Sequence, residues 1–219
     1  MKMPRTDTAY ATWNETWQTE TGRSAWSQAE PDVLSCAKMI RETGGSHALD
    51  LGCGVGRHAL ALARMGFKVD ALDGSPAGLA ELAREAQVAG LDIVTRQGMM
   101  DLLPYRDEVF EYLLTFNVIY HGDRDVVART IAEIHRVLKP GGTLQLTMLS
   151  KRNVNYGQGE EIAPGTFVVT NAGDDKVHPH FYCNARELVS LLAGFEVSSL
   201  IDREHKPGHW HWHAVAGRL

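Results

Sequence analysis

The residues best suited to chemistry lie in a glycine-rich segment, Asp50-Leu-Gly-Cys-Gly-Val-Gly56, that follows an apolar run. Glycine adopts positive φ without a Cβ penalty and lets a ligand approach the backbone, so the segment predicts a tight strand-to-helix turn at a nucleoside site. A dinucleotide turn is usually spaced G-x-G-x-x-G, whereas here the third glycine comes one residue early and is followed by Arg57. Asp50 adds a negative charge that suits a cationic ligand better than a phosphate chain. A tight turn without any ligand is the alternative.

A second acidic residue follows where a ribose ligand is expected. The segment 66–73 is typical of a strand that ends in Asp73, about 20 residues after the glycine turn, and a carboxylate there can accept hydrogen bonds from both ribose hydroxyls. The alternative is a helix cap, because Asp73 and Ser75 precede a helix that begins near Pro76. Asp70 is the weaker ribose candidate, since it falls inside the strand.

Together with Leu138-Lys-Pro-Gly-Gly142 before a strand, these features resemble class I S-adenosylmethionine-dependent methyltransferases, in particular the tellurite-resistance and thiopurine methyltransferase-like branch. The resemblance implies a doubly wound, mostly parallel seven-stranded α/β sheet of the Rossmann-like kind, with an antiparallel last strand. It implies S-adenosyl-L-methionine as cofactor, S-adenosyl-L-homocysteine as product, and methyl transfer to a small molecule. Because both named relatives methylate soft atoms, a sulfur, selenium or tellurium nucleophile is the favoured acceptor.

The resemblance also implies which residues surround the cofactor. The glycine turn lies under its methionine portion, Asp73 holds the ribose, and residues 98–101 flank adenine. Many relatives place an acid directly after that glycine, whereas this chain has Met99, so we expect apolar contact with the adenine unless Met99 and Met100 only fill the core. The predicted cofactor-binding residues are Trp13, Trp17, Asp50, Gly52, Cys53, Gly54, Asp73, Gly74, Met99, Met100 and Asn117.

The acceptor is expected beyond the carboxyl end of the fourth predicted strand, where residues 117–121 face the pocket. Tyr120 and His121 are the predicted catalytic residues, which would orient the acceptor or take its proton. Methyl transfer is a displacement at an already activated carbon, so alignment is essential and a base is optional. The predicted acceptor-binding residues are Trp26, Tyr120, His121, His178 and His180.

Aromatic and imidazole side chains add two further hypotheses. Trp13 and Trp17 are four residues apart and share a helical face, so with Trp26 they predict a lid that packs on adenosine or attracts the sulfonium. Alternatively they only anchor an N-terminal extension to the sheet. Histidines 209, 211 and 213 and the pair at 178 and 180 lack cysteines or acids at ligand spacing, and no metal site is predicted.

We expect a single methyltransferase domain over residues 1–219. It comprises an N-terminal helical lid (1–44), a cofactor-binding core (45–150), a substrate-side insertion (151–182) and a C-terminal helix with an edge hairpin (183–219). In the core, Lys139–Gly142 is expected to stop a helix over 126–138 and reverse the chain into a strand over 143–149.

Composition narrows the function class. The net charge of −5, without a dense lysine and arginine stripe, argues against a nucleic-acid substrate. No apolar run is long enough to cross a membrane and no secretion signal is evident, so a cytoplasmic monomer or homodimer with three reduced cysteines is expected. A non-catalytic S-adenosylmethionine-binding protein and an NAD-dependent oxidoreductase are the alternative functions.

Overall fold

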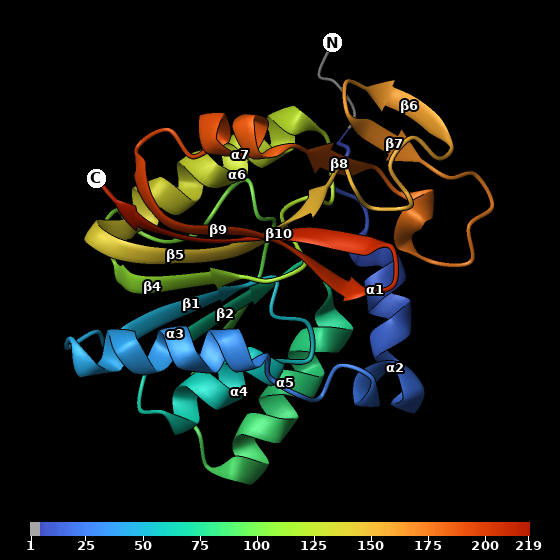
Figure 1. The fold of residues 1–219 in the computed structure, drawn as a ribbon. Helices are drawn as coiled ribbons and strands as arrows, with labels where there is room; N and C mark the ends of the chain where they lie inside the picture. Colours follow the sequence, from blue (N-terminus) through green and yellow to red (C-terminus); the bar gives the residue numbers. More distant parts are fainter. Residues whose placement is uncertain (1–4) are drawn as a thin grey trace.

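The computed structural model describes residues 5–219, in which helices cover both faces of a central sheet (Figure 1). Residues 1–4, with which the predicted N-terminal lid begins, lie outside the described part. The helices are α1 (Tyr10–Trp17), α2 (Glu20–Ser24), α3 (Pro31–Glu42), α4 (Arg57–Arg64), α5 (Pro76–Ala89), α6 (Arg124–Val137), α7 (Ala185–Leu191) and the short 3₁₀ helix η1 (Asp175–Val177). The strands are β1 (His47–Leu51), β2 (Lys68–Asp73), β3 (Ile93–Gln97), β4 (Phe110–Thr115), β5 (Leu138–Ser150), β6 (Glu160–Ala163), β7 (Thr166–Val168), β8 (His180–Cys183), β9 (Phe195–Lys206) and β10 (His209–Arg218).

The strand order confirms the predicted doubly wound sheet. Strands β3, β2, β1, β4 and β5 are parallel neighbours in that order, and β10 joins β5 antiparallel with β9 at the edge. The number of strands differs from the seven predicted, because the sheet formed by the described residues has ten. The three extra strands come from the segment over 160–183, where β8 pairs with the last two residues of β5 and continues through β7 to β6.

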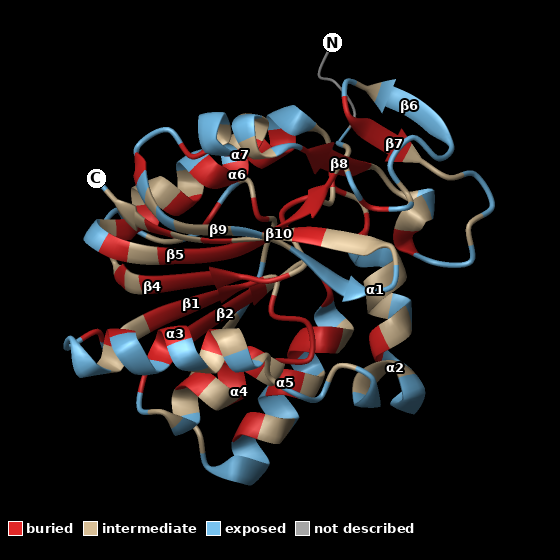
Figure 2. Cartoon of the chain, viewed as in Figure 1, coloured by how far each residue is buried: buried red, intermediate tan, exposed pale blue. Residues whose placement is uncertain are grey.

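The core lies in two layers, one on each face of the sheet. Leu49 and Leu51 of β1 belong to the apolar cluster beneath α6 and α7, while Ala48 belongs to the cluster beneath α3, α4 and α5. Side chains alternate between faces along a strand, and both faces here are covered, so the buried part of β1, residues 48–51, is apolar except for Asp50. Figure 2 shows the central strands as the most deeply buried part of the chain.

Local capping residues set the helix boundaries. Ser75 accepts a hydrogen bond from the Gly78 N–H and is followed by a proline in the first turn of α5, which ends at Gly90 in the left-handed conformation. Asp123 caps α6 in the same way. These two helices have 14 residues each. Among the described residues, no helix is both long enough and apolar enough to span a bilayer.

The segment Lys139–Gly142 stops α6 but lies within β5 rather than before it. Leu138 pairs with Phe110 and Thr143 with Tyr112, so β5 advances five residues while β4 advances two. The additional residues bulge out of the ladder, and Gly141 adopts a φ of 74° that permits the bulge. The expected turn is therefore an irregularity inside a longer strand.

The parallel strands all end at one edge of the sheet, where α1 and α2 lie at the right of Figure 1. The segment with β6, β7 and η1 reaches the same edge from the other side of β5. The turns that follow β1, β2 and β4 therefore meet residues of the N-terminal helices and of the segment with β6, β7 and η1. The candidate site lies where these segments meet.

Candidate functional site

A pocket of about 880 Å³, part of it open to solvent, lies at the carboxyl ends of β1, β2 and β4. Its position is typical of ligand sites in open α/β sheets. Most of the predicted cofactor residues line it, together with several that the sequence did not single out. The lining residues are Asp7, Ala9, Tyr10, Trp13, Trp17, Trp26, Leu51, Gly52, Cys53, Gly54, Val55, Arg57, His58, Leu72, Asp73, Gly74, Gly98, Met99, Met100, Phe116, Asn117, Val118 and His121.

The glycine turn between β1 and α4 forms the floor of the pocket. Gly52, Gly54 and Gly56 have φ values of 74°, 52° and 84°, which side chains rarely adopt. A Cβ on Gly52 would fall 2.3 Å from a Val118 methyl, and one on Gly54 would fall 3.0 Å from the ring of Trp17. The turn is therefore glycine for two reasons, its left-handed backbone and the close approach of neighbouring side chains.

Asp73 ends β2 and faces the same pocket. One carboxylate oxygen accepts a hydrogen bond from the Gly54 N–H and the other from the Ser75 N–H, each at 2.7 Å. Burial raises the pKa of this carboxyl above its ordinary value, although the backbone donors partly offset the shift. Asp73 is thus part of the local turn and cap, as the alternative interpretation expects, and it also lines the pocket. Both oxygens keep further lone pairs for other donors.

Asp50 does not line the pocket. Its side chain is buried and accepts the Ala59 N–H of α4 at 3.0 Å. Burial raises its pKa to about 7, while the nearby Arg57 and the Ala59 hydrogen bond act in the opposite direction. The charge that the sequence placed beside a cationic ligand therefore faces the first turn of α4.

The predicted adenine side is apolar. Met99 and Met100 both line the pocket, with Met100 buried. The acid nearby, Asp101, forms ion pairs with Arg5 and Arg129 instead. Met99 and Met100 therefore present apolar surface to the pocket, and their contact with an adenine ring stays a prediction.

Asn117 is held at the end of β4 in an uncommon conformation. Its φ is 61°, and its backbone N–H donates to the Thr147 hydroxyl, which in turn donates to the Asn117 side-chain oxygen at 3.0 Å. The first contact holds the Asn117 backbone and the second its side chain, and Asn117 lines the pocket. The chain turns there toward Tyr120 and His121.

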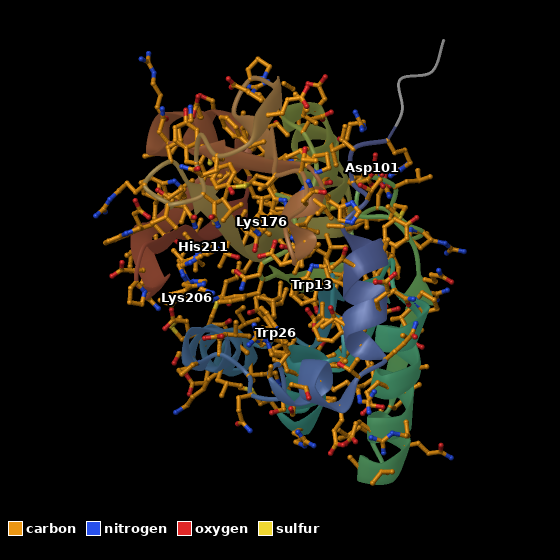
Figure 3. The ribbon with its side chains drawn as sticks, turned by 90° about the vertical axis from the view of Figure 1, so that its right-hand side faces the viewer. Trp13, Trp26, Asp101, Lys176, Lys206 and His211 are labelled. Atoms are coloured by element: carbon orange, nitrogen blue, oxygen red, sulfur yellow. The ribbon has the colours of Figure 1, made fainter. Side chains whose placement is uncertain are left out.

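Three tryptophans from α1 and the segment after α2 close one side of the pocket. Trp13 and Trp17 stack with ring centroids 5.1 Å apart, and Trp26 meets Trp13 edge-on at 5.2 Å. The Arg57 guanidinium lies 4.9 Å from the centre of the Trp26 ring and pairs with Glu30. Figure 3 looks onto this edge of the sheet, with Trp13, Trp26 and Lys176 among the labelled residues. The aromatic group both anchors the N-terminal segment and forms a pocket wall.

The predicted acceptor residues are divided between the pocket and its surroundings. His121 lines the pocket, whereas Tyr120 and His180 are buried behind it and His178 lies at its side. Hydrogen bonds join the His178 ring to the N-terminal segment, since the hydroxyls of Thr8 and Thr12 contact its ring nitrogens at 2.9 and 3.0 Å. Burial raises the pKa of Tyr120 well above its usual value and lowers that of His180 to about 4.

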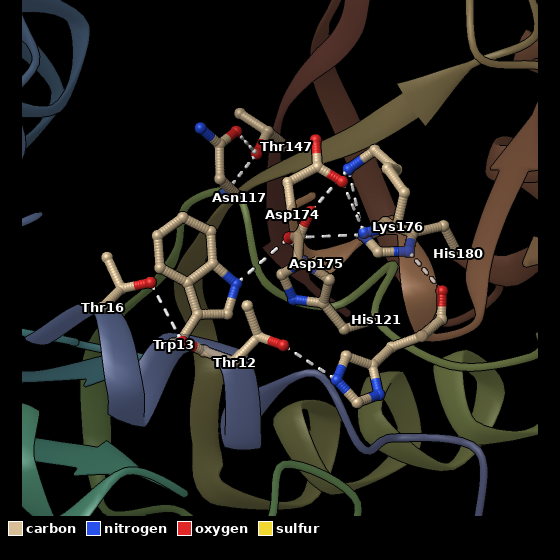
Figure 4. A network of polar contacts seen from close by, with 11 residues as sticks. Thr12, Trp13, Thr16, Asn117, His121, Thr147, Asp174, Asp175, Lys176 and His180 are labelled. Carbon is tan, nitrogen blue, oxygen red and sulfur yellow. Dashed lines mark hydrogen bonds and ion pairs between the residues drawn. The ribbon is translucent and has the colours of Figure 1, made fainter. Parts of the chain in front are cut away.

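Asp175 and Lys176 of η1 complete this side, and sequence reasoning singled out neither. One Asp175 oxygen lies 3.2 Å from His121 Nε2 and 3.1 Å from the indole nitrogen of Trp13, which donates to it (Figure 4). The other accepts from the Lys176 ammonium at 2.8 Å. Burial alone would raise the pKa of Asp175, but its contacts with His121 and the Lys176 ammonium lower it below the ordinary value, so the carboxyl is ionised.

The C-terminal histidines form a separate group beside the pocket. His205 and His213 approach with their Nε2 atoms 2.7 Å apart, and His205 stacks on His211 with ring centroids 4.0 Å apart. Phe116, a pocket residue, lies against His205 and His213. These rings support the pocket wall from β9 and β10.

The central part of the chain is similar to a known protein family. Residues 48–142 match the family described as "Methyltransferase domain". Over this segment the chain is similar to methyltransferase domains. It contains the glycine turn, Asp73 and Asn117, and it ends in Gly142 of the motif before the last part of β5. The matched residues thus include much of the pocket lining, while the tryptophans and η1 lie outside them.

A ubiquinone biosynthesis O-methyltransferase from Caulobacter vibrioides is 37% identical over 109 residues, which are 49% of this chain and 42% of that protein. A homologue from Xanthomonas oryzae is 28% identical over 144 residues, which are 63% of this chain and 57% of that protein. The chain thus spans about half the length of these curated relatives.

Solved structures extend the likeness to the whole fold. The 1,6-didemethyltoxoflavin-N1-methyltransferase of Burkholderia thailandensis, solved with S-adenosylhomocysteine, has a TM-score of 0.70 at 19% identity and covers 100% of this chain and 92% of its own. TehB from Haemophilus influenzae gives 0.67 at 18% identity, covering 96% and 67%. The [4+2]-cyclase SpnF gives 0.73 at 19% identity, covering 100% and 97%. At such identities the likeness concerns the fold, which is the Rossmann-like methyltransferase fold.

Proposed function

We propose that this protein is an S-adenosylmethionine-dependent methyltransferase that acts on a small molecule. The observation that carries the proposal is one pocket that joins the glycine turn and Asp73 of the methyltransferase domain to His121 on the opposite side. A cofactor side and an acceptor side within one cavity are what methyl transfer requires, because the nucleophile, the methyl group and the leaving sulfur must be aligned.

The residues on the cofactor side fit a sulfonium nucleoside. Asp73 is ionisable and keeps lone pairs for ribose hydroxyls, and the backbone of Gly52 and Gly54 lines the pocket floor. The stacked rings of Trp13 and Trp17 offer π faces that attract a cation or pack on a nucleoside. When bound, S-adenosylmethionine supplies a methyl carbon already activated by its sulfonium. Cys53 and Gly74 are proposed to contact it through their backbone.

On the acceptor side we propose His121 as the side chain that meets the acceptor, with Asp175 holding its ring. Tyr120 is proposed to act beside it, although burial keeps its phenol protonated. His178 is proposed to border the acceptor space, and His180 to support the His121 ring against which it packs. Trp26 is proposed to border the acceptor space from the N-terminal segment. The lid (1–44), cofactor core (45–150), acceptor-side insertion (151–182) and C-terminal element (183–219) are the corresponding functional units.

The nature of the acceptor is a finer proposal. A soft sulfur, selenium or tellurium nucleophile is supported by the resemblance to the tellurite-resistance and thiopurine branch, and such nucleophiles need little help from a base. The names of the curated relatives favour an oxygen acceptor instead. We propose that the protein has neither a nucleic-acid nor a membrane partner. We also propose that it is a monomer or homodimer in the cytoplasm.

Calorimetry with S-adenosylhomocysteine tests the cofactor side directly. We expect saturable binding to the wild type and a loss of affinity in Asp73→Ala; wild-type protein that binds neither S-adenosylhomocysteine nor S-adenosylmethionine would refute the assignment. A fluorescence titration with nicotinamide cofactors distinguishes the methyltransferase from the oxidoreductase alternative, because saturable binding of a nicotinamide cofactor would favour the oxidoreductase.

Catalysis is tested with labelled S-adenosylmethionine against thiols, thiopurines, selenite, tellurite and phenols. A methylated product excludes a protein that only binds the cofactor. A phenolic product without any soft-atom product would overturn the soft-acceptor proposal and leave the methyltransferase proposal intact.

A further inference from the structure

Three metal-ligating atoms converge on the acceptor side of the pocket. His121 Nε2 and His180 Nε2 lie 3.2 and 3.4 Å from the same oxygen of Asp175, and the three ligand atoms all fall within 4.8 Å of one another. A tetrahedral ion with ligand bonds of about 2.0–2.1 Å has its ligand atoms about 3.3 Å apart. The two measured separations match that spacing.

The hydrogen bonding of His180 orients it as a ligand. Its Nδ1 lies 2.8 Å from the His178 carbonyl oxygen, so Nδ1 carries the proton and Nε2 presents a lone pair. A carbonyl partner on the distal nitrogen is the usual support of a metal-binding imidazole. The Nε2 lone pair then faces the Asp175 carboxylate, and two acceptors confront each other in a buried site. A cation between them would turn this repulsion into attraction.

The ammonium of Lys176 supplies positive charge to the cluster in the present structure. Its Nζ lies 2.8 Å from the other Asp175 oxygen and 3.2 Å from His180 Nε2 (Figure 4). The lysine side chain is flexible and about one-fifth exposed, so it can withdraw from His180. The oxygen that faces both histidines is not the one that pairs with Lys176.

We propose that His121, Asp175 and His180 bind one divalent transition-metal cation of the zinc type, and that the cation displaces the Lys176 ammonium from His180. Two imidazoles with one carboxylate favour zinc or a neighbouring transition metal over magnesium or calcium, which prefer oxygen ligands. This proposal differs from the expectation that no metal binds. No local spacing marks this site, because Asp175 lies 54 residues from His121 in the chain.

The proposed ion would also bear on the reaction. Three protein ligands are the number found in sites that keep a position for water or substrate. His121 lines the pocket, so an ion there would lie next to the acceptor and favour the deprotonated acceptor atom. This consequence rests on the proposed methyl transfer, whereas the binding of the metal does not.

The test is a titration of the metal-free full-length chain with Co²⁺, followed by Zn²⁺ in competition with a chromophoric chelator. We expect one ion per chain and visible absorption bands of four-coordinate Co²⁺. His180→Ala and His121→Ala should each weaken binding by about 100-fold or more. His178→Ala is the matched control: it removes a neighbouring ring bonded to α1, keeps the carbonyl that orients His180, and should bind as the wild type.

Lys176→Met distinguishes a metal site from a permanent ion-pair cluster. If the metal displaces the ammonium, this variant should bind Co²⁺ more tightly than the wild type. Wild-type protein without Co²⁺ absorption, equal binding by His180→Ala, or weaker binding by Lys176→Met would each overturn the proposal. Circular dichroism and thermal unfolding establish that every variant is folded. Because no cofactor or acceptor is added, failure here leaves the methyltransferase proposal untouched.

Discussion

The replacement Asp73→Asn tests the residue on which the cofactor side depends. Each carboxylate oxygen of Asp73 accepts a backbone N–H at 2.7 Å, one from Gly54 and one from Ser75. Asparagine has a single side-chain oxygen, so one of these two N–H groups loses its acceptor. An unsatisfied buried donor costs about 1–3 kcal/mol, and we expect the free energy of unfolding to fall by that amount.

Cofactor affinity should fall for a separate reason. If Asp73 holds the ribose, asparagine replaces hydrogen bonds to a charged acceptor by weaker neutral ones. Hydrogen bonds to charged groups contribute about 1.5–3 kcal/mol each. Losing one such bond corresponds to a dissociation constant for S-adenosylhomocysteine that is about 10- to 150-fold higher.

Two control variants separate the cap from the ribose contact. Ser75→Ala removes the side-chain acceptor of the Gly78 N–H and should cost about 1 kcal/mol of stability with unchanged affinity. Asp70→Asn alters the other acid of β2, which contacts His47 and Arg96 outside the pocket, and should also leave affinity unchanged. Calorimetry gives the affinities and urea unfolding the stabilities. An Asp73→Asn protein that is less stable but binds S-adenosylhomocysteine like the wild type would refute the ribose assignment.

Three further predictions concern the turn, the lid and the buried acid. Gly54→Ala and Gly44→Ala both place alanine at positive φ, and each should lower the free energy of unfolding by about 1–2 kcal/mol. Only Gly54→Ala should weaken S-adenosylhomocysteine binding, because its Cβ would fall 3.0 Å from a tryptophan ring. Trp13→Phe keeps a ring but loses the N–H that donates to Asp175, so kcat/KM for the acceptor should fall about 10-fold while cofactor affinity changes little. Burial raises the pKa of Asp50 to about 7, so the folded state retains a proton that the unfolded state releases near pH 4. The free energy of unfolding should therefore decline by up to about 4 kcal/mol as the pH rises from 4 to 7. Asp50→Asn should flatten that decline.

Each of these expectations has an outcome that contradicts it. Equal S-adenosylhomocysteine affinities for the two glycine variants would show that the turn does not contact the cofactor. A Trp13→Phe variant that loses cofactor affinity rather than acceptor efficiency would separate the indole from the acceptor side. Urea unfolding between pH 4 and 8 that gives parallel curves for Asp50→Asn and the wild type would show that Asp50 is ionised throughout.

Local sequence signals determined the frame of the molecule. The helix over 76–89 was predictable because a serine cap, an initial proline and a terminal glycine act within a few residues of each other. The glycine turn and Asp73 were equally readable, since backbone conformation and strand ends are set by neighbouring residues. The segment 139–142 shows the limit of such signals: its composition predicted a break, but pairing with β4 made it a bulge inside β5.

The acceptor side depended on the tertiary structure. Asp175 is brought to His121 across 54 residues and to Trp13 across 162, by strands β5 and β8 and by the packing of α1. A carboxylate in a polar segment carries no periodic pattern that would mark it, and its partner follows only from where the chain folds back. The sequence alone therefore determined the turn and strand ends of the cofactor side, whereas the grouping of His121, Asp175 and His180 was decided by long-range packing, because short-range forces set backbone conformation but not which distant side chains meet.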